Sequence, residues 1–165
     1  MSTLGGPVRR VVTGHDTNDV AKVMFDGPAA SFVSPRTGST IWHLWNSEVP
    51  AEIAVGATFE DRGAREHEIP PPANGSRFAI IDFPAGNTGL VHRTESLDYA
   101  IVMAGNIDMD IDGATVSLQA GDVLVQRGTN HAWCNRGKEP ARVAFVLIDA
   151  QPLGIGRHTE PSSAR

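Results

Sequence analysis

The sequence predicts an all-β protein with a single domain, built as a sandwich or a small barrel. Short β-type runs recur at roughly 8–12-residue spacing, and no segment shows a helical period. The 17 Gly and 11 Pro residues also disfavour long helices. With 165 residues, the chain has the usual size of one domain and is long enough to bury a core around a pocket.

The first expected element is an N-terminal β-hairpin. Two β-type runs, at residues 8–12 and 20–25, flank the polar connection at residues 14–19. A further strand is expected at residues 40–45, which are rich in Trp and Ile. We assign residues 1–76 to N-terminal strands and a long loop that extend the domain.

That loop is the stretch between Asn46 and Arg77, where charged residues and Gly replace the β pattern and three prolines follow one another at 70–72. We interpret it as a long surface excursion with one short strand near Ala54. Loops of this length inside a compact domain are usually functional or mobile.

The core of the domain is expected at residues 77–150, where strands follow one another closely. Asp112-Gly113 lies between two alternating runs and predicts a two-residue hairpin, because both residues can adopt positive φ. The polar segment 151–165 predicts a frayed tail. The expected strands are residues 78–83, 89–94, 98–103, 107–111, 115–118, 123–126, 131–135 and 142–149.

Charge and composition exclude several classes of protein. The 14 basic and 19 acidic side chains leave a net charge of −5, which disfavours a nucleic-acid partner. No apolar run approaches the roughly 20 residues that span a membrane. Cys134 is the only cysteine, so an intrachain disulfide is excluded. We expect a cytoplasmic protein.

Two stretches carry the residues that point to chemistry. In the first, His92 and Thr94 are two apart, so on a strand they would share a face, and a turn at 95–97 would return Asp98 to that face. In the second, a turn at residues 127–130 delivers His131.

These stretches resemble the paired motifs of the cupin superfamily, G-x5-H-x-H-x3,4-E-x6-G and G-x5-P-x-G-x2-H-x3-N. The resemblance covers residues 86–135 and identifies a small single-domain cupin of the conserved-barrel type. It implies a double-stranded β-helix, or jelly-roll barrel, with the N-terminal hairpin as an extension. Many cupins are homodimers, and we expect pairing through edge strands or exchange of the hairpin. The matching positions are Gly86, His92, Gly105, Gly121, His131 and Asn135.

The sequence departs from the pattern at the second metal-binding His and at the Glu, which are Thr94 and Asp98 here. His92, Asp98 and His131 remain as a two-His-one-carboxylate set for one divalent metal ion: iron, manganese, nickel or zinc. Thr94 is expected in the pocket beside this set.

Two further residues complete the expected site. Arg127 occupies the position of the motif Pro, and we interpret it as a catalytic residue that holds a substrate carboxylate, together with His92 and Asp98. Trp133 shares a strand face with His131 and is expected to line the pocket.

The resemblance implies a small-molecule enzyme. We expect a metal-dependent lyase or isomerase that decarboxylates, dehydrates or enolises a small polar substrate. One alternative is a non-haem iron dioxygenase. Another is a metal-free protein, in which His92 and Asp98 act as an acid–base pair or the barrel only binds a small ligand.

Overall fold

The computed structural model describes residues 7–18, 20–48, 59–65, 68–152 and 154, and in these ranges it contains strands and no helix. The predicted all-β class is therefore confirmed. The strands are β1 (Arg9–His15), β2 (Ala21–Pro28), β3 (Ala30–Val33), β4 (Thr40–Ser47), β5 (Ser76–Phe83), β6 (Ser96–Ala104), β7 (Asn106–Ile111), β8 (Ala114–Gln119), β9 (Val123–Arg127), β10 (His131–Cys134) and β11 (Ala141–Asp149).

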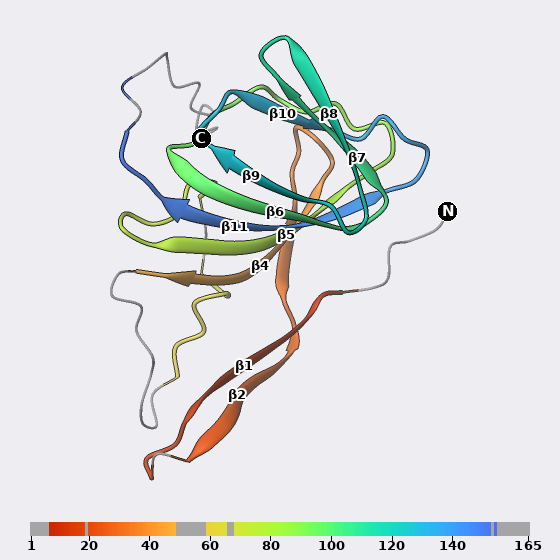
Figure 1. Ribbon diagram of the computed structural model, residues 1–165. Helices are drawn as coiled ribbons and strands as arrows, with labels where there is room; N and C mark the ends of the chain where they lie inside the picture. The colour runs from red at the N-terminus through yellow and green to blue at the C-terminus, as the bar shows by residue number, and fades with distance from the viewer. Residues whose placement is uncertain (1–6, 19, 49–58, 66–67, 153, 155–165) are drawn as a thin grey trace.

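Two antiparallel sheets face each other and form a jelly-roll barrel (Figure 1). One has the order β3-β4-β5-β11-β6-β9, and the other has the order β10-β7-β8. Alternating residues of both sheets point inward, because side chains along a strand alternate between its faces. The buried cluster between the sheets consists of Phe83, Ala100, Val102, Ile107, Met109, Trp133, Ala141, Val143 and Phe145.

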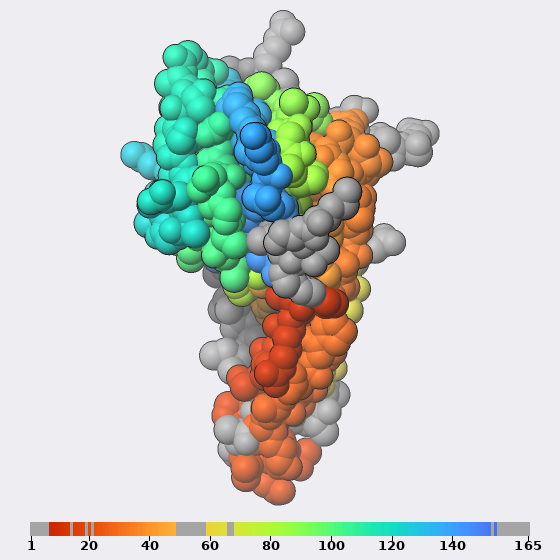
Figure 2. Space-filling model, turned by 90° about the vertical axis from the view of Figure 1, so that its right-hand side faces the viewer, coloured from red at the N-terminus to blue at the C-terminus, as the bar shows by residue number. Residues whose placement is uncertain are grey.

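The predicted N-terminal hairpin is confirmed as a separate two-stranded sheet, β1–β2. Figure 2 shows it as an arm that extends beyond the barrel. Arg10 fixes the arm at its root: this buried side chain donates to the carbonyl oxygen of Leu44 at 2.9 Å and to the carboxylate of Asp61 at 2.6 Å. The arm is thus tied both to β4 and to the long excursion.

Two of the motif glycines lie at turns that other residues would strain. Gly105, between β6 and β7, has φ +74°, and an added Cβ would come within 2.5 Å of the carbonyl oxygen of Pro140. Gly121, before β9, has φ +96°. Glycine occupies such conformations without the steric cost that a Cβ imposes.

The strand expected at residues 89–94 is not formed. Within this segment His92 makes one isolated bridge, to His131 on β10, and Asn87 just before the segment bridges Asn135, the residue that follows β10. β10 instead forms its ladder with β7 on its other side. β3 was not predicted, because all four of its residues are exposed and its burial shows no alternation.

The hairpin at Asp112-Gly113 is present, with Ile111 opposite Ala114. Of the two turn residues only Gly113 has positive φ, at +75°, so the expectation for Asp112 is wrong. A glycine at the second turn position alone can provide the left-handed conformation here.

The excursion after β4 is irregular where the structure describes it, at residues 59–65 and 68–75. Arg77 holds its end against the barrel by donating to the carbonyl oxygens of Glu68 at 2.5 Å and Ile69 at 2.8 Å. The strand expected near Ala54 and most of the tail lie outside the described residues. The described part of the chain has no helix of the length and apolarity needed to cross a membrane.

Candidate functional site

A cavity of about 360 Å³ opens between the two sheets, a volume within the range of small-molecule sites. It is bounded by β4, β5, β6, β10 and β11, by the loop between β3 and β4, by Ile69 of the excursion and by residues 87–94. Its wall is mostly apolar, with polar groups gathered at two ends. The apolar lining residues are Ile41, Ile69, Ala79, Ile81, Phe83, Leu90, Val91, Trp133, Phe145 and Leu147.

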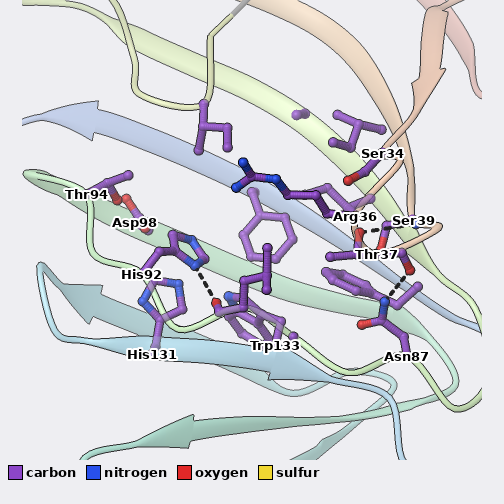
Figure 3. Close-up of a pocket in the computed structure, with 18 of the residues that line it drawn as sticks. Ser34, Arg36, Thr37, Ser39, Asn87, His92, Thr94, Asp98, His131 and Trp133 are labelled. Carbon is purple, nitrogen blue, oxygen red and sulfur yellow. Dashed lines mark hydrogen bonds between the residues drawn. The ribbon is translucent and has the colours of Figure 1, made fainter. Parts of the chain in front are cut away.

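One polar end holds the paired histidines, His92 and His131 (Figure 3). Their backbones exchange two hydrogen bonds, N–H of each to the carbonyl oxygen of the other, at 2.9 and 3.0 Å. The ring centroids are therefore only 4.3 Å apart. Nδ1 of His92 donates to the carbonyl oxygen of Leu90 at 2.9 Å, which leaves Nε2 with its lone pair.

His131 is buried, and burial lowers its pKa to about 4, so the ring is neutral at pH 7. Nδ1 of His131 lies 3.0 Å from the carbonyl oxygen of Thr129, to which it donates, and 2.9 Å from the side-chain amide nitrogen of Gln126. Sequence reasoning missed Gln126. Its inward position on β9 follows from strand alternation and is the signal that could have found it.

Asp98 is the buried carboxyl at this end of the cavity. Ser96 donates a 2.5 Å hydrogen bond to Oδ1 of Asp98, and the hydroxyl groups of Ser96 and Thr94 lie 2.8 Å apart. Burial raises the pKa of Asp98 above its usual range, opposed in part by the bond from Ser96 and by His92. This carboxyl therefore keeps its proton to a higher pH than an exposed Asp does.

The structure brings His92, Thr94, Asp98, His131 and Trp133 to one cavity. The donors needed for a three-ligand metal centre do not meet there: within the ranges that the structure describes, no three His, Cys, Asp or Glu side chains are close enough to share an ion. Oδ1 of Asp98 accepts the hydrogen bond from Ser96. The residues as placed do not fit the expected two-His-one-carboxylate centre.

Arg127 lies outside the cavity, which corrects the expectation that it faces the substrate. It ends β9 opposite Leu97, is exposed, and is not among the residues that line the cavity. Gln126, its neighbour on the strand, takes the inward position, and successive side chains of a strand point to opposite faces.

The second polar end was missed by sequence reasoning. Its residues come from the loop between β3 and β4 and from Asn87, which sits 50 positions further along the chain from Thr37. Only the fold brings these segments together, since neither has a local motif. Figure 3 shows this group opposite the histidines, with Trp133 between the two ends. Its members are Ser34, Arg36, Thr37, Ser39 and Asn87.

Comparison with known proteins agrees with the resemblance to cupins. The family model for a cupin domain matches residues 79–148. Phomopsin biosynthesis cluster protein C' of Diaporthe leptostromiformis is 47% identical over 152 residues, which cover 88% of this chain and 80% of that protein. The cupin-domain-containing oxidoreductase virC of Hypocrea virens is 39% identical over 113 residues, 66% of this chain and 57% of that protein.

Among solved structures, the cupin domain of Schizosaccharomyces pombe Cnp3 superposes with a TM-score of 0.54, covering 86% of this chain and 87% of that chain at 14% sequence identity. At that identity the likeness concerns the fold alone. The family model, the relative that is 47% identical over most of its length, the paired motifs and the jelly-roll barrel agree with one another. Together they show that this chain belongs to the cupin superfamily.

Proposed function

We propose that the protein is a small-molecule enzyme that enolises a carbonyl compound inside the barrel by metal-free acid–base catalysis. One observation carries the proposal: two imidazoles and a buried carboxyl line the same end of a cavity whose remaining wall is largely apolar. Acid and base groups in such a site act in a low-dielectric environment, where proton transfer to and from a substrate is effective.

His92 is the base in this proposal. Its Nδ1 donates to Leu90, so Nε2 holds the lone pair that can accept a proton. His131 suits the base role less, because its lowered pKa of about 4 makes it a weak proton acceptor. Held by its bond to the carbonyl oxygen of Thr129, His131 instead packs against His92 and positions it.

Asp98 is the acid, since burial raises its pKa and favours the protonated form. Nε2 of His92 removes a proton from the carbon next to the carbonyl, and the C–H electron pair becomes the C=C bond of the enol. The carbonyl oxygen takes the proton of Asp98. Return of a proton to a different carbon gives an isomer, and loss of a neighbouring hydroxyl group as water gives a dehydrated product.

Enolisation is also compatible with the name of the relatives. Several are called cupin-domain-containing oxidoreductases, a description that concerns those proteins. An enol is electron-rich and is the form of a carbonyl compound that an external oxidant such as dioxygen attacks most readily. A shared proton-transfer step could thus precede different outcomes in different members.

The test is proton exchange of acetophenone in D₂O, followed by NMR at its methyl group. We expect the protein to accelerate exchange over buffer and His92→Gln to lose about 100-fold of that acceleration, the lower end of what a positioned base contributes. His15→Gln is the matched control, because His15 lies on the hairpin arm, away from the cavity lining. Equal exchange in parent and buffer would contradict the proposal, and binding without exchange would indicate a ligand-binding module.

The anchoring of both rings through Nδ1 favours a second candidate. This arrangement is common for metal-ligating histidines, whose other nitrogen then faces the metal ion. A divalent ion held by His92 and His131 would leave its other coordination positions to water and substrate. Elemental analysis of the purified protein decides: near-stoichiometric metal that is lost in both His92→Ala and His131→Ala supports this candidate over the metal-free enzyme.

A further inference from the structure

We propose that the polar end of the cavity opposite the histidines is a subsite for a hydroxyl group of the substrate. The proposal rests on the proposed function for the place of the reacting carbonyl, at the histidine end. It adds the chemical class of the substrate: an apolar carbonyl compound that carries a hydroxyl group at the end remote from the carbonyl.

Two buried polar atoms at this end lack a partner. Ser39 is 3% exposed and Asn87 is 6% exposed, and both line the cavity. Neither Oγ of Ser39 nor Oδ1 of Asn87 has a hydrogen-bond partner among the described residues. A buried polar atom without a partner destabilises the fold, so two of them beside a cavity indicate that the partner is a ligand.

Asn87 is held in one orientation. Its Nδ2 donates to the carbonyl oxygen of Thr37 at 2.5 Å, and its backbone N–H donates to the carbonyl oxygen of Pro84 at 3.2 Å. Because the amide nitrogen is engaged, Oδ1 is the atom left for a ligand, and it can only accept. The subsite therefore calls for a group that donates a hydrogen bond to Asn87.

Ser39 supplies the complementary function. Its hydroxyl group can donate, and its position is set by the backbone N–H bond to Oγ1 of Thr37 at 3.3 Å. A ligand hydroxyl group satisfies both residues at once, since its O–H donates to Asn87 and its oxygen accepts from Ser39. A carboxylate would place one acceptor against another at Oδ1 of Asn87, but Arg36 lines the same end and is a cation, so the test below includes a carboxylate probe.

The wall between the two ends is largely apolar, although Arg36 and Arg77 also line the cavity. Trp133 stands between the groups in Figure 3, and its ring meets that of Phe145 edge to face at 5.2 Å between centroids. Ile41, Ile81 and Phe83 complete this part of the wall. Such surfaces favour an aromatic or branched apolar group over a polar chain.

The test is equilibrium binding of three probes by calorimetry: 4-hydroxyacetophenone, acetophenone and 4-acetylbenzoate. We expect the hydroxyl probe to bind about tenfold more tightly than acetophenone, the sum expected of two ordinary hydrogen bonds. In Ser39→Ala that preference should fall about fivefold, while acetophenone binds as in the parent. Because Oγ of Ser39 has no described partner, the variant should melt no lower than the parent.

Ser31→Ala is the matched control, because Ser31 is exposed on β3 and does not line the cavity. It should keep the parent preference. Four results would each overturn the subsite. The hydroxyl probe could bind no more tightly than acetophenone, or 4-acetylbenzoate could bind more tightly than either. Ser39→Ala could lose the same affinity for every probe, or no probe could bind at all. Because binding is measured without turnover, a hydroxyl preference without proton exchange would leave the subsite standing and reject the proposed enzyme.

Discussion

At the scale of single residues, burial decides what each titratable group of the cavity can do. His131 and Asp98 have the same imidazole and carboxyl groups as histidines and aspartates on surface loops, but both side chains are almost completely buried. Burial disfavours the charged form in each, which lowers the pKa of His131 and raises that of Asp98. The two groups are therefore both biased towards neutrality, as an apolar substrate site requires.

The lowered pKa of His131 predicts a loss of stability on acidification. Below pH 6.5 the His131 imidazole of the unfolded chain is protonated, whereas in the folded chain it stays neutral until the pH falls to about 4. The stabilisation present above pH 6.5 should thus be lost as the pH falls to 4, by about 3 kcal/mol for such a shift. In His131→Gln this part of the pH dependence should be missing, as measured by urea unfolding across that range.

His15→Gln, on the hairpin arm, is the control and should retain the pH dependence of the parent. Unfolding free energies of parent and His131→Gln that fall in parallel between pH 6.5 and 4 would contradict the prediction.

At the scale of elements, the irregular segment 87–94 positions half of the site. It supplies Asn87 to one end of the cavity and His92 and Thr94 to the other. Its close contact with β10 depends on Gly89, where an added Cβ would come within 2.3 Å of the carbonyl oxygen of Trp133. The segment can approach the strand backbone only because position 89 has no side chain.

Gly89→Ala should therefore destabilise the protein by about 1–3 kcal/mol, the usual cost of an extra methyl group in a packed site. The measurement is urea unfolding. Thr88→Ala, at the exposed neighbouring position, should stay within about 0.5 kcal/mol of the parent. A Gly89→Ala protein as stable as Thr88→Ala would show that the contact with β10 carries no constraint.

Alternation and turn chemistry predict most strands of the barrel, and motif spacing predicts His92, Asp98 and His131 in one place. Both are local signals in the sequence, so they cannot predict which strands pair or which distant segments meet in the folded protein. Residues 89–94 have a β pattern but no ladder partner, because β10 pairs with β7. Ser39 has no motif, and only the return of β4 beside β5 brings it to the cavity.

At the scale of the whole molecule, the outer face of the six-stranded sheet is unusually apolar. Tyr99 and Ile101 on β6 pair with Val125 and Val123 on the edge strand β9, and all four are exposed, Val123 by 69%. Met103 continues the patch along β6 at 50% exposure. Contiguous apolar surface of this kind marks an interaction site.

The expected homodimer is therefore predicted to use this face, with β9 at the edge of the contact. The parent should have twice the 17.6 kDa mass of one chain by light scattering, and Val125→Lys should shift it towards the monomer. Gln119→Lys, at an exposed position on β8 of the other sheet, should leave the mass unchanged. A parent that is monomeric at all concentrations, or a Val125→Lys protein that remains dimeric, would contradict the prediction.

The two isolated bridges also determine how the cavity can open. The segment that carries His92 is joined to β10 and its end by three backbone hydrogen bonds, two between His92 and His131 and one from Asn135 to Asn87. Breaking these three, together with the bond from the Gly89 N–H to Sγ of Cys134, leaves the ladders of both sheets intact. The wall beside the histidines can therefore undergo local opening, and a ligand can exchange with solvent there, far more often than the barrel unfolds.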